Sequence, residues 1–272
     1  MSFGSFLEDG TGGFAEYTRV PAGRTIRFPE SISFNEAASI GVASITSVAA
    51  LYEIFKFPSP PAAPSGTPIL IWSGASIFPQ RDVLILASIG LIGIQLAVLS
   101  GLEVITTASP RNFDLLKSLG AKHVFDYNSP TVVEDIKRVT NGQLQYLYDC
   151  ISYSGSTAKA VQCLAPSGGK VATVLPVDPA TLDKKVEIKN IAVFKMTGKT
   201  FTFGGREFPA TKQDKEFYEK MCGVLSDLYL AGKIKPNPIR VMGGWDKLAE
   251  GFKFMEEGKV HGEKLIYEVI KE

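Results

Sequence analysis

Two short runs of small residues carry the first candidate chemistry of this chain. Residues 73–76 follow a short apolar run, and residues 88–90 open a long apolar helical pattern. A turn of small residues between a buried strand and a helix lets backbone N–H groups approach a pyrophosphate. We therefore predict that these runs line the diphosphate of a dinucleotide, through Ser73, Gly74, Ala75, Ser76, Ser88 and Gly90. A tight turn that binds no ligand is the alternative interpretation.

Residues 77–87 separate these two runs. The segment contains Pro79 and several polar groups at the point where a helix should begin, and without it the turn and the helix are continuous. We interpret residues 77–87 as an insertion inside the dinucleotide-binding turn. If the insertion loops out, the phosphate site is preserved. If it alters the start of the helix, the N–H donors are misplaced.

The end of the second expected strand bears on the choice of cofactor. An NAD-preferring site usually has an acidic residue there to bind the ribose 2′-hydroxyl. This chain has no acid at that point and instead has Ser109 and Arg111, which suit a 2′-phosphate. We predict NADP(H) as the cofactor. The simpler interpretation is that Ser109 caps a helix and Arg111 is a solvated first-turn residue.

These candidates depend on a regular alternation of strands and helices. Apolar runs and turn residues predict strands at 68–72, 103–107, 123–125, 146–150 and 170–175, and helices at 89–100, 111–119, 131–140 and 156–164. Consecutive βα units favour a parallel sheet with right-handed crossovers. The fold class predicted from them is α/β, with a doubly wound parallel-sheet (Rossmann) cofactor domain.

The flanking segments follow other patterns. Before the alternation, residues 13–20 and 25–28 favour strands, Ser33 begins a capping box, and residues 37–55 form a helical pattern with a break near Gly41. Residues 57–67 are a Pro-rich connector. After the alternation we expect strands at 199–203 and 264–270, and helices at 212–231 and 245–257.

Composition narrows the class of protein. A net charge of +1 gives no reason to expect nucleic acid or a membrane as partner. The three cysteines are widely spaced, and the start of the chain has no signal-peptide pattern, so we expect a cytoplasmic protein. Two histidines offer few ligands for zinc, and we predict no metal site. Cys150 and Cys163 are expected in the core.

The combined motifs resemble the zinc-independent medium-chain dehydrogenase/reductase superfamily, and within it the trans-acting enoyl reductases of polyketide biosynthesis. The resemblance is carried by WSGAS and SIG around the insertion, by VITTASPRNFDLLKSLGAKHVFDY, by YLYDCIS and by GKVHGEKLIYEV. GGFAEYTRVPAGRTIRFPESISFNEAASI resembles the end of the family's GroES-like β-barrel catalytic domain. The resemblance thus implies a remnant of that domain at 1–43, the Rossmann NADP-binding domain at 44–204, and a segment returning to the catalytic domain at 205–272.

The resemblance also implies further contacts with the cofactor. Thr46 is expected near the nicotinamide. Asn112 joins Ser109 and Arg111 at the 2′-phosphate, with Tyr127 beside the adenosine. Leu175 and Pro176, and Phe203 and Gly204, are expected to border the nicotinamide cleft, and Val260 and His261 to close over the cofactor.

Two departures from the family pattern bear on activity. The family has a longer N-terminal catalytic domain, so we expect this chain to be N-terminally truncated, without several barrel strands and a loop that contacts cofactor and substrate. The second departure is the insertion at 77–87. Together they suggest a splice form or an imperfect gene model.

Two functional hypotheses follow. The first is an NADPH-dependent oxidoreductase of secondary metabolism that reduces an activated C=C bond in an enoyl thioester or enone. Its substrate would be a small molecule or carrier-bound, with a polyketide synthase as a possible partner, and no residue of this chain is a convincing proton donor. The second is a catalytically impaired remnant that binds cofactor or protein at most. The protein is expected to be a monomer or a homodimer.

Overall fold

Six parallel strands form the central sheet of the computed structural model. The structure describes residues 12–13, 15–73, 87–153, 155–182, 186–203, 205–260 and 262–269. The sheet has the order β3-β2-β1-β4-β5-β6. Its strands are β1 Pro68–Trp72, β2 Glu103–Ala108, β3 His123–Asp126, β4 Tyr146–Asp149, β5 Gly169–Thr173 and β6 Val186–Asn190. This order defines a doubly wound α/β fold, whose order reverses between β1 and β4. The predicted fold class is confirmed.

The sheet is buried on both faces, which explains the uninterrupted apolar run of β1. Ile69 and Ile71 lie in the hydrophobic cluster on one side of the sheet, whereas Leu70 and Trp72 lie in the cluster on the other side. All four side chains are between 0% and 3% exposed. Alternate residues of a strand point to opposite faces, so a strand covered on both sides needs apolar residues at every position.

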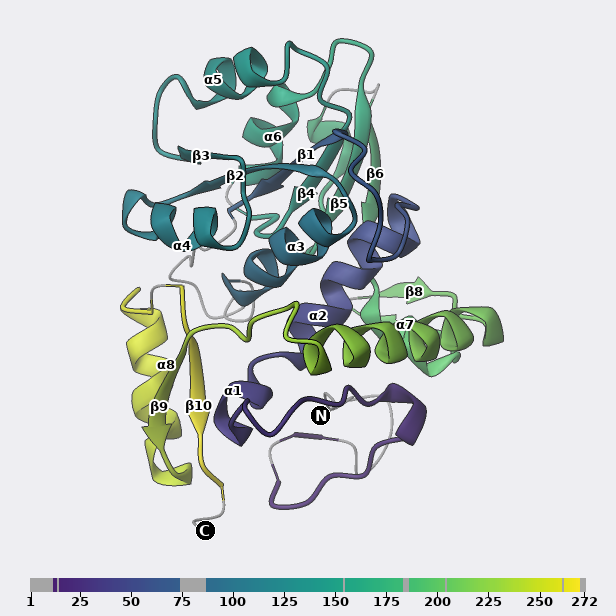
Figure 1. The fold of residues 1–272 in the computed structure, drawn as a ribbon, viewed down its shortest axis with the longest axis vertical. Coiled ribbons are helices and arrows are strands. Elements are labelled where there is room, and N and C mark those ends of the chain that lie inside the picture. Colours follow the sequence, from purple (N-terminus) through teal and green to yellow (C-terminus); the bar gives the residue numbers. More distant parts are fainter. Residues whose placement is uncertain are drawn as a thin grey trace.

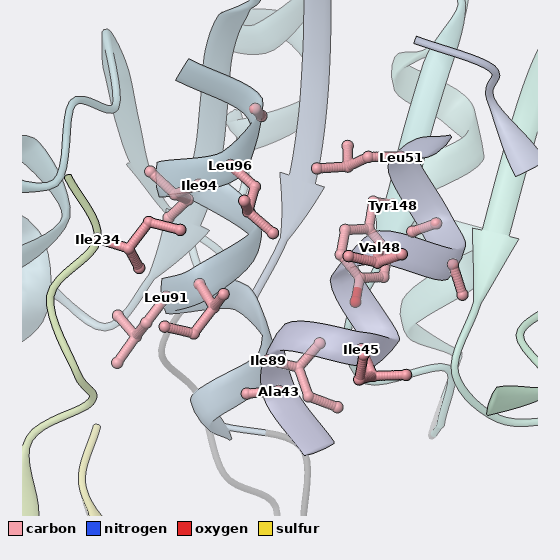
Figure 2. Close-up of a cluster of buried hydrophobic side chains, with 14 of the residues drawn as sticks. Ala43, Ile45, Val48, Leu51, Ile89, Leu91, Ile94, Leu96, Tyr148 and Ile234 are labelled. Atoms are coloured by element: carbon pink, nitrogen blue, oxygen red, sulfur yellow. The ribbon is translucent and has the colours of Figure 1, made fainter. Parts of the chain in front are cut away.

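Helices cover both faces of this sheet. Figure 1 shows α3 and α4 on one side and α5 and α6 on the other. The bounds of the covering helices are α2 Gly41–Val48, α3 Ala87–Leu99, α4 Phe113–Ser118, α5 Val132–Val139 and α6 Ser156–Ala160. Figure 2 shows side chains from α2, α3 and β4 meeting in the larger cluster, among them Ile45, Leu96 and Tyr148. The apolar composition of α3 is thus the signature of a helix buried on nearly every side.

The N-terminal segment confirms one prediction and corrects another. Ser33 forms the expected capping box with Glu36 at the start of α1 Phe34–Ala38, and the helical pattern breaks before α2 begins at Gly41. A π-helix, η2 Ala49–Ile54, continues α2. The strands predicted at 13–20 and 25–28 are wrong. The described residues between 12 and 28 form no strand, and the short 3-10 helix η1 Ala22–Arg24 is the regular element among them.

The reason is that this segment packs against a helix, so no neighbouring strand among the described residues is there to pair with its backbone. The N–H of Arg27 donates to the Ser226 hydroxyl at 3.0 Å, and the Ile26 side chain is buried to 2% exposure in the core. Ser226 belongs to α7 Lys212–Leu230. An alternating pattern does not make a strand unless another strand offers its backbone groups.

The C-terminal part adds two small sheets and two helices. β7 Phe201–Phe203 and β8 Arg206–Phe208 form an antiparallel hairpin. β9 Ile239–Gly243 pairs in parallel with β10 Lys264–Tyr267, and the 3-10 turn η7 Trp245–Lys247 and helix α8 Leu248–Glu256 lie between them in the chain. Figure 1 shows β9, β10 and α8 together at the lower left, with α7 crossing beneath the main sheet. Among the described residues no helix is long and apolar enough to cross a membrane.

Sequence reasoning missed β6, β8 and β9. β6 is the edge strand, and its sequence alternates Glu187 and Lys189 with apolar residues. β9 depends on a partner strand more than 20 positions further along the chain. The division of the chain at 1–43, 44–204 and 205–272 stays a prediction. The six-stranded sheet lies entirely inside the middle range.

Candidate functional site

The candidate site lies at the carboxyl ends of the parallel strands. Ser73 directly follows β1 and has a φ of +60°, a left-handed conformation that turns the chain sharply. Its N–H donates to the Thr107 hydroxyl of β2 at 2.8 Å. This bond joins β1 to its neighbour at the edge where doubly wound proteins bind dinucleotides. The predicted contacts Gly74, Ala75 and Ser76, and residues 77–86 of the insertion, lie outside the described residues.

The start of α3 contains the next two predicted contacts. Ser88 and Gly90 lie in the first turn of α3, and both are buried. The Ser47 hydroxyl donates to the backbone oxygen of Ile89 at 3.1 Å and thereby ties α2 to this turn. Thr46, the preceding residue of α2, is 5% exposed and donates to the Val42 oxygen of its own helix at 2.7 Å. The structure therefore brings Thr46 and the start of α3 onto adjoining turns of two packed helices.

A glycine that sequence reasoning did not single out permits this packing. A Cβ atom built on Gly93 would lie 3.1 Å from Cε1 of Tyr148 in β4 and 3.4 Å from the Ser47 hydroxyl oxygen. In dinucleotide-binding folds, the last glycine of the motif allows close packing of the helix against the sheet. The spacing Gly90-x-x-Gly93 was visible in the sequence and was the signal for this role.

The residues predicted at the adenosine end come together at the ends of β2 and β3. The hydroxyls of Ser109 and Tyr127 are 3.2 Å apart and share a hydrogen bond. Arg111 is exposed and lies in the short helix η3 Pro110–Asn112, which begins directly after Ser109. Ser109 occupies the N-cap position of that helix, as the simpler interpretation expects, but its side chain makes no capping hydrogen bond. Two hydroxyls and a guanidinium form a donor set that suits a phosphate.

Two more elements reach the same place. Asn112 is buried, and a Cβ built on Gly262 would lie 3.2 Å from its side-chain oxygen. The C-terminal segment therefore runs beside the adenosine end, with Val260 only 3% exposed, while His261 lies outside the described residues. Lys159 of α6 donates to the backbone oxygen of Tyr127 at 2.7 Å. Sequence reasoning missed Lys159 because it lies 32 positions from its partner.

Besides Thr46, the predicted nicotinamide contacts lie on two separate elements. Leu175 and Pro176 follow β5, where Leu175 packs on the main core and Pro176 is exposed. The N–H of Val174 donates to the Ser152 hydroxyl at 3.0 Å, which joins this loop to the one after β4. Phe203 lies outside the main sheet, on the β7–β8 hairpin, and is 56% exposed. Gly204 lies outside the described residues.

A buried carboxylate organises the loop after β4. Asp149 is 0% exposed and accepts hydrogen bonds from the N–H groups of Ile151 and Ser152 and from the hydroxyls of Ser156 and Thr157. Burial raises the pKa of Asp149, and these four hydrogen bonds oppose that rise. No sequence pattern marked this residue, because its partners become neighbours only when the loop folds back.

Side chains able to hold a metal do not gather in the described part of the chain, where no three His, Cys, Asp or Glu residues form a group. The three cysteines are free and buried, as expected for Cys150 and Cys163. The donor set at the carboxyl ends of β1, β2 and β3 fits a phosphorylated dinucleotide, since small residues allow close approach and no acid stands at the tip of β2.

Comparison with known proteins defines the class. A family model described as "Zinc-binding dehydrogenase" matches residues 88–214. The chain is 35% identical over 262 residues to "Trans-enoyl reductase ACTTS2" of Alternaria alternata, covering 95% of this chain and 71% of that protein. It is 33% identical to "Trans-enoyl reductase eqxC" of Fusarium heterosporum, covering 96% and 72%.

Solved structures share the fold. The "Crystal structure of CurK enoyl reductase" superposes with a TM-score of 0.68 at 19% identity, covering 92% of this chain and 67% of that one. A quinone oxidoreductase of Pseudomonas syringae pv. Tomato DC3000 gives a TM-score of 0.66 at 19% identity, covering 91% and 69%. Together with the family model and the curated relatives, this makes the chain a medium-chain dehydrogenase/reductase, a class of nicotinamide-dependent oxidoreductases. Within that class it belongs to the trans-enoyl reductase family, which confirms the resemblance found in the sequence.

Proposed function

We propose that this protein reduces an activated C=C bond of an enoyl thioester or enone, with NADPH as cofactor, in polyketide or related secondary metabolism. Its substrate would be carried by a polyketide synthase or be a free small molecule. Family membership supports enoyl reduction. The choice of NADPH depends on one observation, the Ser109–Tyr127 hydroxyl pair beside Arg111 at the ends of β2 and β3.

The residues of this chain would bind and orient the cofactor. N–H groups at the start of α3 would face the diphosphate, with Ser73 at the end of β1. Ser109, Arg111 and Tyr127 would hold the 2′-phosphate. A bound nicotinamide supplies the hydride that goes to the β-carbon of the substrate.

The nicotinamide end would be shaped by apolar contacts. Thr46 from α2, and Leu175 and Pro176 from the loop after β5, would fix the nicotinamide and exclude water from one side. Negative charge develops on the carbonyl oxygen of the substrate, and the proton then reaches the α-carbon from water. The described residues offer no titratable side chain that we assign to this proton transfer.

A comparison of cofactors tests the proposal. NADPH and NADH are titrated into the purified protein while nicotinamide fluorescence is followed. We expect NADPH to bind more tightly, and Arg111→Ala to weaken NADPH binding by about 10- to 100-fold, since a hydrogen bond to a charged group contributes about 1.5–3 kcal/mol. NADH binding should change little. Arg138→Ala is the matched control, because Arg138 is an exposed arginine paired with Asp135 on α5.

Two results would contradict the proposal. If neither nucleotide binds, the enzyme hypothesis fails for this chain and the remnant hypothesis stands. If Arg111→Ala weakens NADPH and NADH equally, Arg111 does not read the 2′-phosphate.

The insertion is tested separately by deleting residues 77–87. The segment begins four positions after Ser73 and ends within the first turn of α3, between the two ends of the predicted phosphate turn. If the insertion disturbs this turn, the deletion should tighten NADPH binding. Unchanged affinity would show that the insertion leaves the site intact.

A further inference from the structure

The β7–β8 hairpin leaves and rejoins the rest of the protein at one place. Gly198 ends the short 3-10 helix η6 Val193–Thr197 before the hairpin, with a φ of +72°. A Cβ built on Gly198 would lie 3.1 Å from Cβ of Lys215 and 3.3 Å from the backbone oxygen of Thr211. Thr211 is the N-cap of α7, which follows the hairpin. The element before the hairpin and the element after it are therefore in direct contact.

One lysine joins these two elements to a third. Nζ of Lys195 in η6 lies 2.5 Å from Oε1 of Glu53 and 2.9 Å from Oδ1 of Asp214. Asp214 lies in the first turn of α7, and Glu53 lies in the π-helix η2 that continues α2. The Tyr218 hydroxyl donates to the other carboxylate oxygen of Glu53. We call these four residues the Lys195 cluster.

The Lys195 cluster is partly buried, so solvent screens its ion pairs less than it screens exposed ones. The charged side chains are 19% to 23% exposed, and Tyr218 is 0% exposed. Burial alone would lower the pKa of Lys195, but its hydrogen bonds to Glu53 and Asp214 leave it above its ordinary value. Burial alone would raise the pKa of Asp214, but hydrogen bonds from Lys195 and Thr211 leave it below its ordinary value. Lys195 thus stays charged and holds two carboxylates that would otherwise repel each other.

Apolar packing of the hairpin is concentrated at Phe201, whose ring contacts Phe194 of η6 edge to face, with the ring centroids 5.8 Å apart. Of the residues in β7 and β8, Phe201 alone is buried, at 7% exposure, and its ring stacks on Phe208. A cavity of about 260 Å³ lies between the end of β6, the π-helix and the end of β8, and Glu53, Lys195 and Phe208 line part of it. Beside this cavity the Lys195 cluster joins the two elements that flank the hairpin, η6 and α7, to each other and to the π-helix.

We propose that Lys195 is a positioning residue, which holds the β7–β8 hairpin, and with it Phe203, at a fixed place beside the carboxyl end of β6. Glu53 belongs to the continuation of the helix that carries Thr46. The ion pair of Glu53 with Lys195 would therefore fix the position of Phe203 relative to Thr46, the two expected neighbours of the nicotinamide. This role rests on the proposed function, since it concerns the nicotinamide half of the cofactor.

Hydrogen exchange of residues 199–210 tests the attachment without any cofactor. In Lys195→Met we expect the amides of β7 and β8 to exchange about tenfold faster or more, because local opening becomes easier. Lys195→Arg keeps the charge and should restore slow exchange. Lys212→Met is the matched control, since Lys212 lies on the same helix as Asp214 but is 85% exposed and pairs only with Glu216 in the described part of the chain.

Ligand binding then tests the consequence. Lys195→Met should weaken NADPH by about tenfold, corresponding to about 1.4 kcal/mol, and leave 2′,5′-ADP unchanged, because that ligand lacks the nicotinamide half. Lys195→Arg should recover most of the NADPH affinity. A structural defect of the whole domain would weaken both ligands together.

The outcomes separate this proposal from the proposed function. Unchanged exchange of the hairpin in folded Lys195→Met, or an equal loss for both ligands, overturns the positioning role. If the wild-type protein binds neither ligand, the proposed function fails, and the exchange data still decide the attachment. If Lys195→Met does not fold, Glu53→Gln removes one of the two ion pairs at constant size. The hairpin amides of Glu53→Gln should then exchange faster than those of the wild-type protein. If they exchange at the wild-type rate, the proposal is overturned.

Discussion

Removing the Asp149 carboxylate should loosen the loop after β4 and lower the stability of the whole domain. In Asp149→Ala, the N–H groups of Ile151 and Ser152, now 2.9 and 3.0 Å from the carboxylate, lose their acceptor in a buried site. Each unsatisfied buried donor costs about 1–3 kcal/mol. The Ser156 and Thr157 hydroxyls also lose their acceptor, but a hydroxyl hydrogen can rotate, which a backbone N–H cannot do.

The net loss is smaller than the sum of these terms. Burial raises the pKa of Asp149, so ionising it in the folded protein is itself unfavourable, and its removal relieves that cost. We therefore expect Asp149→Ala to lower the free energy of unfolding by about 2–4 kcal/mol. Asp149→Asn keeps an oxygen for both N–H groups and an amide for the hydroxyls, and should lose less than about 1 kcal/mol.

The pH dependence gives an independent check. A folded pKa above the unfolded value means that the folded protein binds more protons, so wild type loses stability as pH rises from about 4 toward the folded pKa. Asparagine does not titrate. The advantage of wild type over Asp149→Asn should therefore be larger at acid pH than at neutral pH.

Urea unfolding followed by tryptophan fluorescence measures these differences. Trp72 is 3% exposed and lies opposite Asp149 in the β1–β4 pairing, so it reports on this region. A loss below about 1 kcal/mol for Asp149→Ala, the lower end of the expected cost of one unsatisfied donor, would refute the reasoning. An Asp149→Asn variant as unstable as Asp149→Ala would refute it equally.

Three further predictions concern packing, charge and thiols. Gly93→Ala should lower the free energy of unfolding by about 1–3 kcal/mol, because the new Cβ would press on Tyr148. Gly223→Ala should raise it by about 0.5–1 kcal/mol, because a Cβ there has no atom within 4 Å. Urea titrations measure both changes. The pKa of Asp214 is lowered in the folded state, so its contribution holds above the unfolded pKa and is lost as pH falls below about 4; the stability gap to Asp214→Asn should close there. Burial raises the pKa of one thiol to about 12 and of another to about 11, so a thiol reagent at about pH 8 should label the native protein slowly and the unfolded protein fully. The thiol with the pKa of about 12 belongs to Cys163, and the one with the pKa of about 11 belongs to Cys222. Burial also raises the pKa of the third thiol, that of Cys150.

The strands at the centre of the sheet were predictable because their signal is local. β1 begins and ends where the apolar run does, at Pro68 and Trp72, and α7 begins at the residue expected from its sequence. Ser109 was singled out at the end of its strand, and Tyr127 came from the family resemblance. The structure brings their hydroxyls together because the ends of adjacent parallel strands lie at one edge. The N-terminal strands failed because alternation in sequence does not supply a pairing partner.

The sequence by itself thus determined the α/β alternation, the family, and the residue types at the edge where a dinucleotide would bind. The tertiary structure decided which distant groups meet there. Lys195 and Glu53 are 142 positions apart, and Lys159 reaches Tyr127 across 32 positions. Hydrophobic periodicity reports only which face of an element is buried. The partner of a buried charge depends on how the elements pack, and that is set by the whole chain at once.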